Sequence, residues 1–216
     1  MRKAFLVAVC LFLVCLTSAA FADTSGPYVS NTIAYELTDW THALELPKFD
    51  ASLGTLNSID LILSGSTNSV LTVTNYGSKV AKGSTHSTVT LSITDPQSLL
   101  NLDLNIASSD FKFSNLASGA SQTSNILLGS GSAQASYTSQ NILDEFTGTG
   151  TISLPTSTET ETSLTYSGGN TLASQATNAS AFAKVIYHYS AVPEPSSIIA
   201  LLTGGVGLLG LLRRRK

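Results

Sequence analysis

Three histidines are the first side chains to consider for chemistry, and they lie far apart, at His42, His86 and His188. Metal sites and His-activated nucleophiles often show short spacings such as H-x-x-x-H or H-E-x-x-H, and the sequence contains neither. The many serines do not form a G-x-S-x-G nucleophile elbow. We therefore expect no metal, no cofactor and no catalytic residue, with each histidine on a polar or half-buried strand face.

Paired carboxylates are the remaining catalytic option. Asp144 and Glu145 are adjacent, and Glu159 and Glu161 would share one face of a strand, where repulsion is the expected consequence. A glycosidase pair assembled from distant strands stays open as an alternative. A structural calcium ion also stays open, although no D-x-D-x-D-G loop is present.

Aromatic side chains are the residues most suited to contact a sugar. The single tryptophan, Trp40, can offer a glycan-stacking face, or it can anchor a core. Tyrosines that can join such a platform are Tyr28, Tyr35, Tyr137, Tyr166, Tyr187 and Tyr189. The sequence leaves both interpretations open.

The elements that must position these residues are short strands. Apolar and polar residues alternate at 88–94, 100–106 and 181–189, and apolar runs cover 59–63 and 70–74. In the first of these segments Val89, Leu91 and Ile93 share one face. Together with the turn signals between the runs, this pattern predicts an all-β fold, an antiparallel β-sandwich with a jelly-roll arrangement as one option.

Small and polar residues mark the expected breaks between strands. They occur at 64–66, 75–77 and 167–170. Residues 129–140 and 156–162 are rich in Ser and Thr and poor in apolar residues, so they are expected as long loops or exposed edge strands. No long segment has a helical period between the two ends of the chain.

The N-terminus has the order of a secretory signal peptide over residues 1–22. Arg2 and Lys3 precede an apolar run, and Ala20 and Ala22 stand at the −3 and −1 positions before Asp23. We expect the secretion translocon and signal peptidase as partners, with cleavage after Ala22. Both cysteines would then be removed, so the mature chain can form no disulfide.

Charge is unevenly distributed along the chain. The body expected as one domain, residues 23–191, carries five basic and 13 acidic side chains, a net charge of −8. Binding to a phosphate backbone needs clustered Lys and Arg. Nucleic acid is therefore not an expected partner.

The C-terminal segment, residues 192–216, has three parts. Val192-Pro193-Glu194-Pro195-Ser196 is expected to be extended, because proline disfavours helix at the residue before it. Residues 196–212 form a short apolar stretch near the lower length limit of a transmembrane helix. Arg213, Arg214, Arg215 and Lys216 would stop transfer on the cytoplasmic side.

This order of parts resembles the PEP-CTERM sorting signal. The resemblance implies recognition and cleavage by an exosortase-type membrane enzyme in a Gram-negative host that makes exopolysaccharide. It also implies that Pro193, Glu194 and Pro195 are the recognition element, as substrate residues.

A second segment, from Trp40 to Leu56, contains Leu-Pro-Lys-Phe-Asp followed by Leu-Gly-Thr-Leu. It resembles the choice-of-anchor E domain of exported bacterial proteins, which implies a β-rich extracellular body without an established activity. We expect Leu44, Leu46 and Phe49 to be buried beside Leu53, Leu56 and Ile59, with Gly54 in a turn.

Together these features predict an exported protein that is not an enzyme. It would pass through the inner membrane as an anchored precursor and reach the cell surface or extracellular matrix, with a structural or adhesive role linked to exopolysaccharide. The alternatives are a carbohydrate-binding module for exopolysaccharide and, behind it, a glycoside hydrolase.

Overall fold

The computed structural model describes residues 22–192, so the predictions for residues 1–21 and 193–216 lie outside the described part of the chain. Eleven strands and one short helix follow one another in this region. They are β1 Ala22–Val29, β2 Ile33–Leu37, β3 Thr41–Pro47, β4 Gly54–Asn75, β5 Ala81–Thr94, β6 Asn101–Ala107, β7 Phe111–Leu116, β8 Ser121–Thr123, β9 Leu127–Tyr137, α2 Gln140–Phe146, β10 Thr151–Ser167 and β11 Thr171–Ala191.

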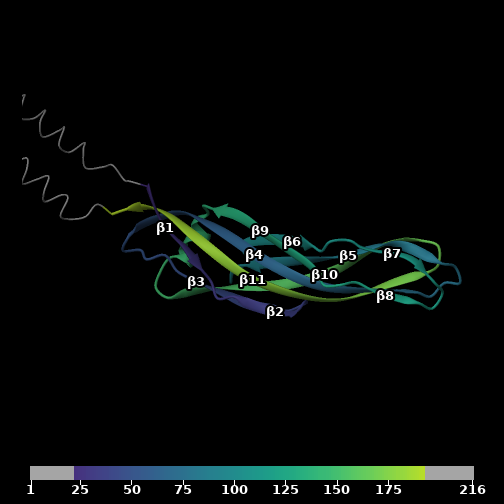
Figure 1. The fold of residues 1–216 in the computed structure, drawn as a ribbon. Helices are drawn as coiled ribbons and strands as arrows, with labels where there is room; N and C mark the ends of the chain where they lie inside the picture. Colours follow the sequence, from purple (N-terminus) through teal and green to yellow (C-terminus); the bar gives the residue numbers. More distant parts are fainter. Residues whose placement is uncertain (1–21, 193–216) are drawn as a thin grey trace, which may run out of the picture.

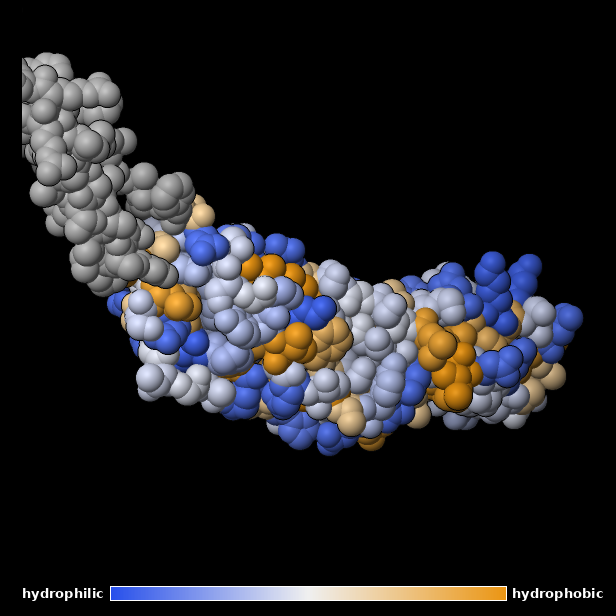
Figure 2. All heavy atoms as spheres, turned by 60° about the vertical axis from the view of Figure 1, so that its left-hand side comes forward, coloured by the Kyte–Doolittle hydropathy of each residue, from blue (hydrophilic) through white to orange (hydrophobic). Residues whose placement is uncertain are grey.

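Two antiparallel sheets face each other, as predicted for a β-sandwich. The first has the order β1-β11-β4-β8, with β2 also paired to β11 and β9 to β4. The second has the order β3-β10-β5-β6, with β7 also paired to β5. The strands run along the length of an elongated body (Figure 1), and the space-filling view shows the same elongated outline for the described residues (Figure 2). A strand of 22 residues such as β4 extends roughly 70 Å.

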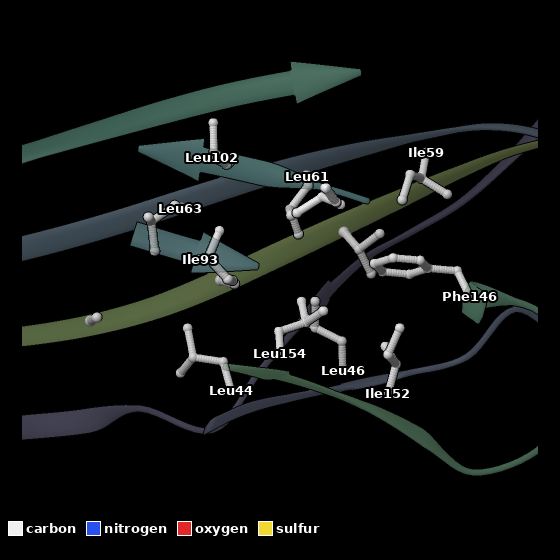
Figure 3. Packing of buried hydrophobic residues seen from close by; sticks show 14 of the residues in the cluster. Leu44, Leu46, Ile59, Leu61, Leu63, Ile93, Leu102, Phe146, Ile152 and Leu154 are labelled. Carbon is white, nitrogen blue, oxygen red and sulfur yellow. The ribbon is translucent and has the colours of Figure 1, made fainter. Parts of the chain in front are cut away.

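The main core lies between the two sheets and is formed by alternating residues of the long strands. Leu61 and Leu63 of β4 and Leu44 and Leu46 of β3 are fully buried in it. Figure 3 shows these side chains packing together with residues of β10 and α2. Burial of this apolar surface is the main stabilising contribution to the fold.

A layer of hydroxyl groups separates this core from a smaller one. Ser69 Oγ accepts hydrogen bonds from Ser87 Oγ at 2.8 Å and Thr177 Oγ1 at 3.0 Å, and all three residues are buried. Beyond this layer, a second cluster contains Val73, Ala81, Phe113 and Leu116. The end of the body that holds this second cluster is called the distal end here.

The alternation predicted for three strands is confirmed. Val89, Leu91 and Ile93 are fully buried, and Leu100, Leu102, Leu104 and Ile106 are also buried. In β11 the buried face is that of Ala183, Val185, Tyr187 and Tyr189. Period-two alternation therefore identified the sides of these strands correctly.

The break predicted at residues 64–66 is wrong, because β4 runs without interruption from Gly54 to Asn75. A Cβ atom at Gly65 would collide with Leu91 Cδ1 and would lie 3.0 Å from Ile106 Cδ1. The glycine is thus inside the core, where it lets the facing sheet approach, and it forms no turn.

The two Ser/Thr-rich stretches are mostly strand. Residues 127–137 form β9, which pairs only with β4 and is therefore an edge strand, as one of the two alternatives predicted. For residues 156–162 the prediction of a loop or an exposed edge strand is wrong, because they lie within β10, which is between β3 and β5 in the sheet, and Thr156 and Thr158 are buried. Helix α2, with Ile142, Leu143 and Phe146 buried, was not predicted.

The segment from Trp40 to Leu56 contributes to the core largely as expected. Leu44, Leu46 and Phe49 are buried, but Leu53 is exposed. The turn predicted at Gly54 is wrong, since Gly54 begins β4 and pairs with Ala191. Its φ of +153° and the closeness of the Ser190 carbonyl leave no room for a Cβ atom.

Asn75 joins three turns at the distal end. Its Oδ1 accepts hydrogen bonds from the backbone N–H groups of Gly77 at 2.9 Å and Asn170 at 3.1 Å. Its Nδ2 donates to the carbonyl oxygens of Lys79 at 2.8 Å and Leu116 at 2.9 Å. Because Asn75 is fully buried, these four bonds hold the distal turns together in a water-free position.

Candidate functional site

Each histidine lies close to one carboxylate on the outer surface of the sandwich. The nitrogen–oxygen distances are 2.8 Å for His42 and Glu36, 3.3 Å for His86 and Asp110, and 2.9 Å for His188 and Asp60. The three pairs share no strand with one another, and Asp110 lies in the loop just before β7. Within residues 22–192, no three His, Cys, Asp or Glu side chains are grouped so that they can hold a metal ion.

The His188 pair extends to a serine, but its order differs from that of a catalytic triad. Ser136 Oγ donates a hydrogen bond to Asp60 Oδ1, while His188 Nε2 lies 2.9 Å from Asp60 Oδ2. In a triad the histidine stands between the acid and the hydroxyl and removes its proton. Here the carboxylate is in the middle, so the cluster links β9, β4 and β11 and does not activate Ser136.

Stability should depend on pH through Asp60. The hydrogen bonds from Ser136 and then His188 hold the pKa of the Asp60 carboxyl below its usual value. A carboxyl with a lowered folded-state pKa stabilises the protein above its unfolded-state pKa, and this contribution is lost as the pH falls through the folded-state pKa. We expect Asp60→Asn to cost about 1–2 kcal/mol at pH 7 and much less at pH 3.

Urea unfolding of both proteins at pH 7, 5 and 3 measures this difference. Asp110→Asn is the matched control, since Asp110 is 53% exposed and its 3.3 Å contact with His86 is longer. A cost of Asp60→Asn that stays constant from pH 7 to pH 3 would contradict the assignment.

The predicted pair of Asp144 and Glu145 is not a pair in space. Asp144 is exposed and accepts a hydrogen bond from Gln140, whereas both carboxylate oxygens of Glu145 are buried without a hydrogen-bond partner among the described residues. Burial first, and then the nearby Asp95, raises the pKa of Glu145, while Lys48 partly opposes the shift. The structure thus places Glu145 beside Asp95, a pair that was not predicted because the two residues lie far apart in the sequence.

Glu159 and Glu161 share the exposed face of β10, as expected. They lie opposite Thr90 and Thr88 of β5. Neither glutamate forms a hydrogen bond or ion pair with another described residue that would orient it for acid–base chemistry.

Trp40 lies in the core and not on a sugar-binding face. It is 6% exposed, belongs to the main core cluster, and its ring centroid is 5.3 Å from that of His42. This burial overturns the glycan-stacking interpretation of Trp40 in favour of the core interpretation. Tyr187 and Tyr189 are likewise buried, whereas Tyr166 is 44% exposed.

A groove of about 510 Å³ lies near the distal end, over strands β5, β7 and β10. The side chains that line it from the outer face of the sheet are Lys82, Ser84, Lys112, Ser114, Thr165 and Ser167. No local sequence pattern predicts this groove. The one available signal was that three of the five lysines of the body occur between residues 79 and 112.

Both ends of the described chain meet at the opposite, proximal end of the body. Ala22 of β1 pairs with Ser190 of β11, and Asp23 Oδ2 accepts a hydrogen bond of 3.2 Å from the Tyr189 hydroxyl. β11 then ends at Ala191, and the N–H of Val192 donates to the carbonyl of Leu53 at 3.2 Å. Figure 1 shows both ends of the described chain on the same side.

Residues 191–216 match the PEP-CTERM protein-sorting motif. The chain is therefore an exported protein that carries the signal recognised by an exosortase-type enzyme. The matched segment begins at Ala191, the last residue of β11. This motif implies a secreted, membrane-anchored precursor in a Gram-negative bacterium.

Of the residues predicted for sorting, only a few are described. Val192 is 60% exposed, and Ala22 and Asp23 lie in β1. Outside the described residues lie Ala20, Pro193, Glu194, Pro195, Ser196, Arg213, Arg214, Arg215 and Lys216. No helix within residues 22–192 has the length and hydropathy to cross a membrane, and the predicted span at 196–212 lies beyond them.

Other comparisons add little. No curated protein matches the chain in sequence. One solved structure, that of the Gt strain of infectious bursal disease virus, aligns with 83% of this chain and 44% of that chain at 10% identity and a TM-score of 0.15. The resemblance of residues 40–56 to choice-of-anchor E domains stays a prediction.

Proposed function

We propose that this chain is a non-enzymatic surface or matrix protein, processed by an exosortase-type enzyme at Pro193-Glu194-Pro195, with a structural or adhesive role linked to exopolysaccharide. The observation that carries the proposal is the sorting motif directly after β11. The body is thereby held at its proximal end. Its distal end then lies roughly 70 Å from the point of attachment, the length of β4.

The positions of the two ends support this arrangement. Ala22 pairs with Ser190, so the predicted signal-peptide cleavage site lies beside the end of β11, the strand that precedes the sorting residues Pro193-Glu194-Pro195 in the sequence. A precursor held in the membrane by its signal peptide or by its C-terminal tail would therefore present the body in the same orientation, with the proximal end toward the membrane. The polar groups of the outer surface engage one another in pairs such as His42 with Glu36, which supports a structural role for them.

Replacing Pro193, Glu194 and Pro195 together by alanine tests the proposal. We expect the variant to stay in the inner membrane with its tail uncleaved, because the recognition element is removed. Mass spectrometry of the mature chain and surface labelling measure both effects. Glu159→Ala is the control, since it also removes one exposed acid but leaves the tail intact. Unchanged mature mass and surface delivery in the triple variant would refute the proposal.

A carbohydrate-binding module is the second candidate function. What favours it is the distal groove, which is lined by cationic and hydroxyl side chains and lies at the end of the body away from the sorting motif. The groove also replaces Trp40 as the place where a sugar would bind.

A further inference from the structure

The distal groove is built from two rows of side chains on three neighbouring strands. Lys112 and Thr165 flank Ser84 in one row, because both pair with it across the sheet. In the next row Lys82 is paired with Ser167. Inward-facing residues such as Thr85 and Phe113 are buried, which confirms that these rows face outward.

A β-bulge shapes the side of the groove formed by β7. Ala81 pairs with Leu116 and Gly83 with Phe113, so β7 has one extra residue opposite Lys82. Asn115, with φ of +55°, takes up this extra residue. Bulges increase the local twist and redirect side chains, and here the bulge places Ser114 beside Lys82 in the lining.

The charge of the groove is opposite to that of the body. Segments 74–84, 111–121 and 163–173 contain Lys79, Lys82 and Lys112 and no Asp or Glu, although the body carries −8 overall. The neighbouring acid, Asp110, lies 3.3 Å from His86. Ion pairs among the described residues involve histidines and none of these lysines. Lys82 and Lys112 stand diagonally across two strands, about 7–8 Å apart at the backbone. A bound anion would relieve their repulsion.

The uncharged part of the lining suits a sugar. Four hydroxyl side chains, those of Ser84, Ser114, Thr165 and Ser167, offer donors and acceptors. The hydrogen bonds of Asn75 connect the turns around the groove, so little ordering is needed when a ligand binds.

We propose that the distal groove binds a polysaccharide whose sugars carry carboxylate groups, with Lys82 and Lys112 pairing with the carboxylates. The inference deepens the proposed function and relies on it only for the extracellular location of the ligand. An exported chain meets extracellular polymers, which favours a polysaccharide over nucleic acid as the occupant, and because the body as a whole is negative, only the lysine-bearing groove would attract an anionic chain. The open groove can hold a segment of a long chain.

The test measures binding of the full chain, purified in detergent after export, to polygalacturonate. Carboxyl-reduced polygalacturonate, dextran and double-stranded DNA are the comparison ligands. We expect binding to polygalacturonate alone, weakening as salt rises. The double variant Lys82→Gln with Lys112→Gln should bind on the order of tenfold more weakly. The control Lys48→Gln with Lys184→Gln makes the same charge change outside the groove and should bind like the unaltered protein.

Three results would overturn the inference: no binding to polygalacturonate, equal loss in both double variants, or equal binding to the reduced polymer or DNA. Circular dichroism of each variant checks folding. The groove variant should still be processed and delivered to the surface. A failure of sugar binding with normal delivery therefore counts against the groove alone, whereas the proline and glutamate substitutions in the tail test sorting.

Discussion

Asn75→Ala should lower the free energy of unfolding by about 3 kcal/mol or more and the Tm by roughly 10 °C. The substitution removes four side-chain hydrogen bonds at once, two donated to the carbonyls of Lys79 and Leu116 and two accepted from the N–H groups of Gly77 and Asn170. Asn75 is fully buried, so water cannot easily replace these bonds. Thermal and urea unfolding measure the effect.

Asn75→Asp distinguishes the roles of the two side-chain atoms. The aspartate keeps the acceptor for Gly77 and Asn170, but it presents a second oxygen to the carbonyls of Lys79 and Leu116. We expect a cost at neutral pH at least as large as that of alanine, since a charged acceptor would be buried against two others. Asn178→Ala, which removes one part-buried bond to Asn68, is the control and should cost about 1 kcal/mol. An Asn75→Ala protein as stable as this control would contradict the role of Asn75.

The second large effect is expected at Gly65. Gly65→Ala should destabilise the fold by about 2–3 kcal/mol, because the added methyl would meet Leu91 Cδ1, Ile106 Cδ1 and the Ser180 carbonyl in the closed space between the sheets. The partner residue Gly131, directly opposite on β9, provides a matched control. A Cβ there has Leu104 Cδ1 as its nearest neighbour at 3.2 Å, so Gly131→Ala should cost clearly less.

A double variant identifies the cause of this loss. Combining Gly65→Ala with Leu91→Ala removes the nearest clashing atom, so the combined cost should be smaller than the sum of the two single costs. Urea unfolding of the four proteins gives this coupling energy. Strict additivity, or equal costs at Gly65 and Gly131, would show that Gly65 is not needed for the approach of the sheets.

Gly65 also shows where prediction from sequence fails. A Ser-Gly-Ser triplet is a typical turn signal, yet here it continues a strand of 22 residues. The glycine is needed because side chains of the facing sheet pack against it. Those side chains, Leu91 and Ile106, come from other strands, so no local pattern reveals them.

The sorting motif and the distal groove also differ in whether the sequence alone could reveal them. The sorting motif is contiguous and is read by an enzyme as an extended segment, so it could be recognised from residues 192–216 directly. The distal groove depends on the pairing of Ser84 with Lys112 and Thr165, which are 28 and 81 positions away. For Trp40, the residue type alone allowed either a core position or an exposed sugar-binding face. Only the packing of the folded chain showed that it lies in the core.

The sequence by itself determined the all-β class, the inward faces of strands such as 88–94, the charge of the body and the sorting motif at its end. These properties depend on residue types at short spacing, through side-chain alternation and local chain stiffness. Only the tertiary structure decided the register of the strands, the position of Asn75 between three turns and the placement of Lys82 and Lys112 in one groove. These depend on contacts between residues far apart in the chain, which side-chain packing between the two sheets selects.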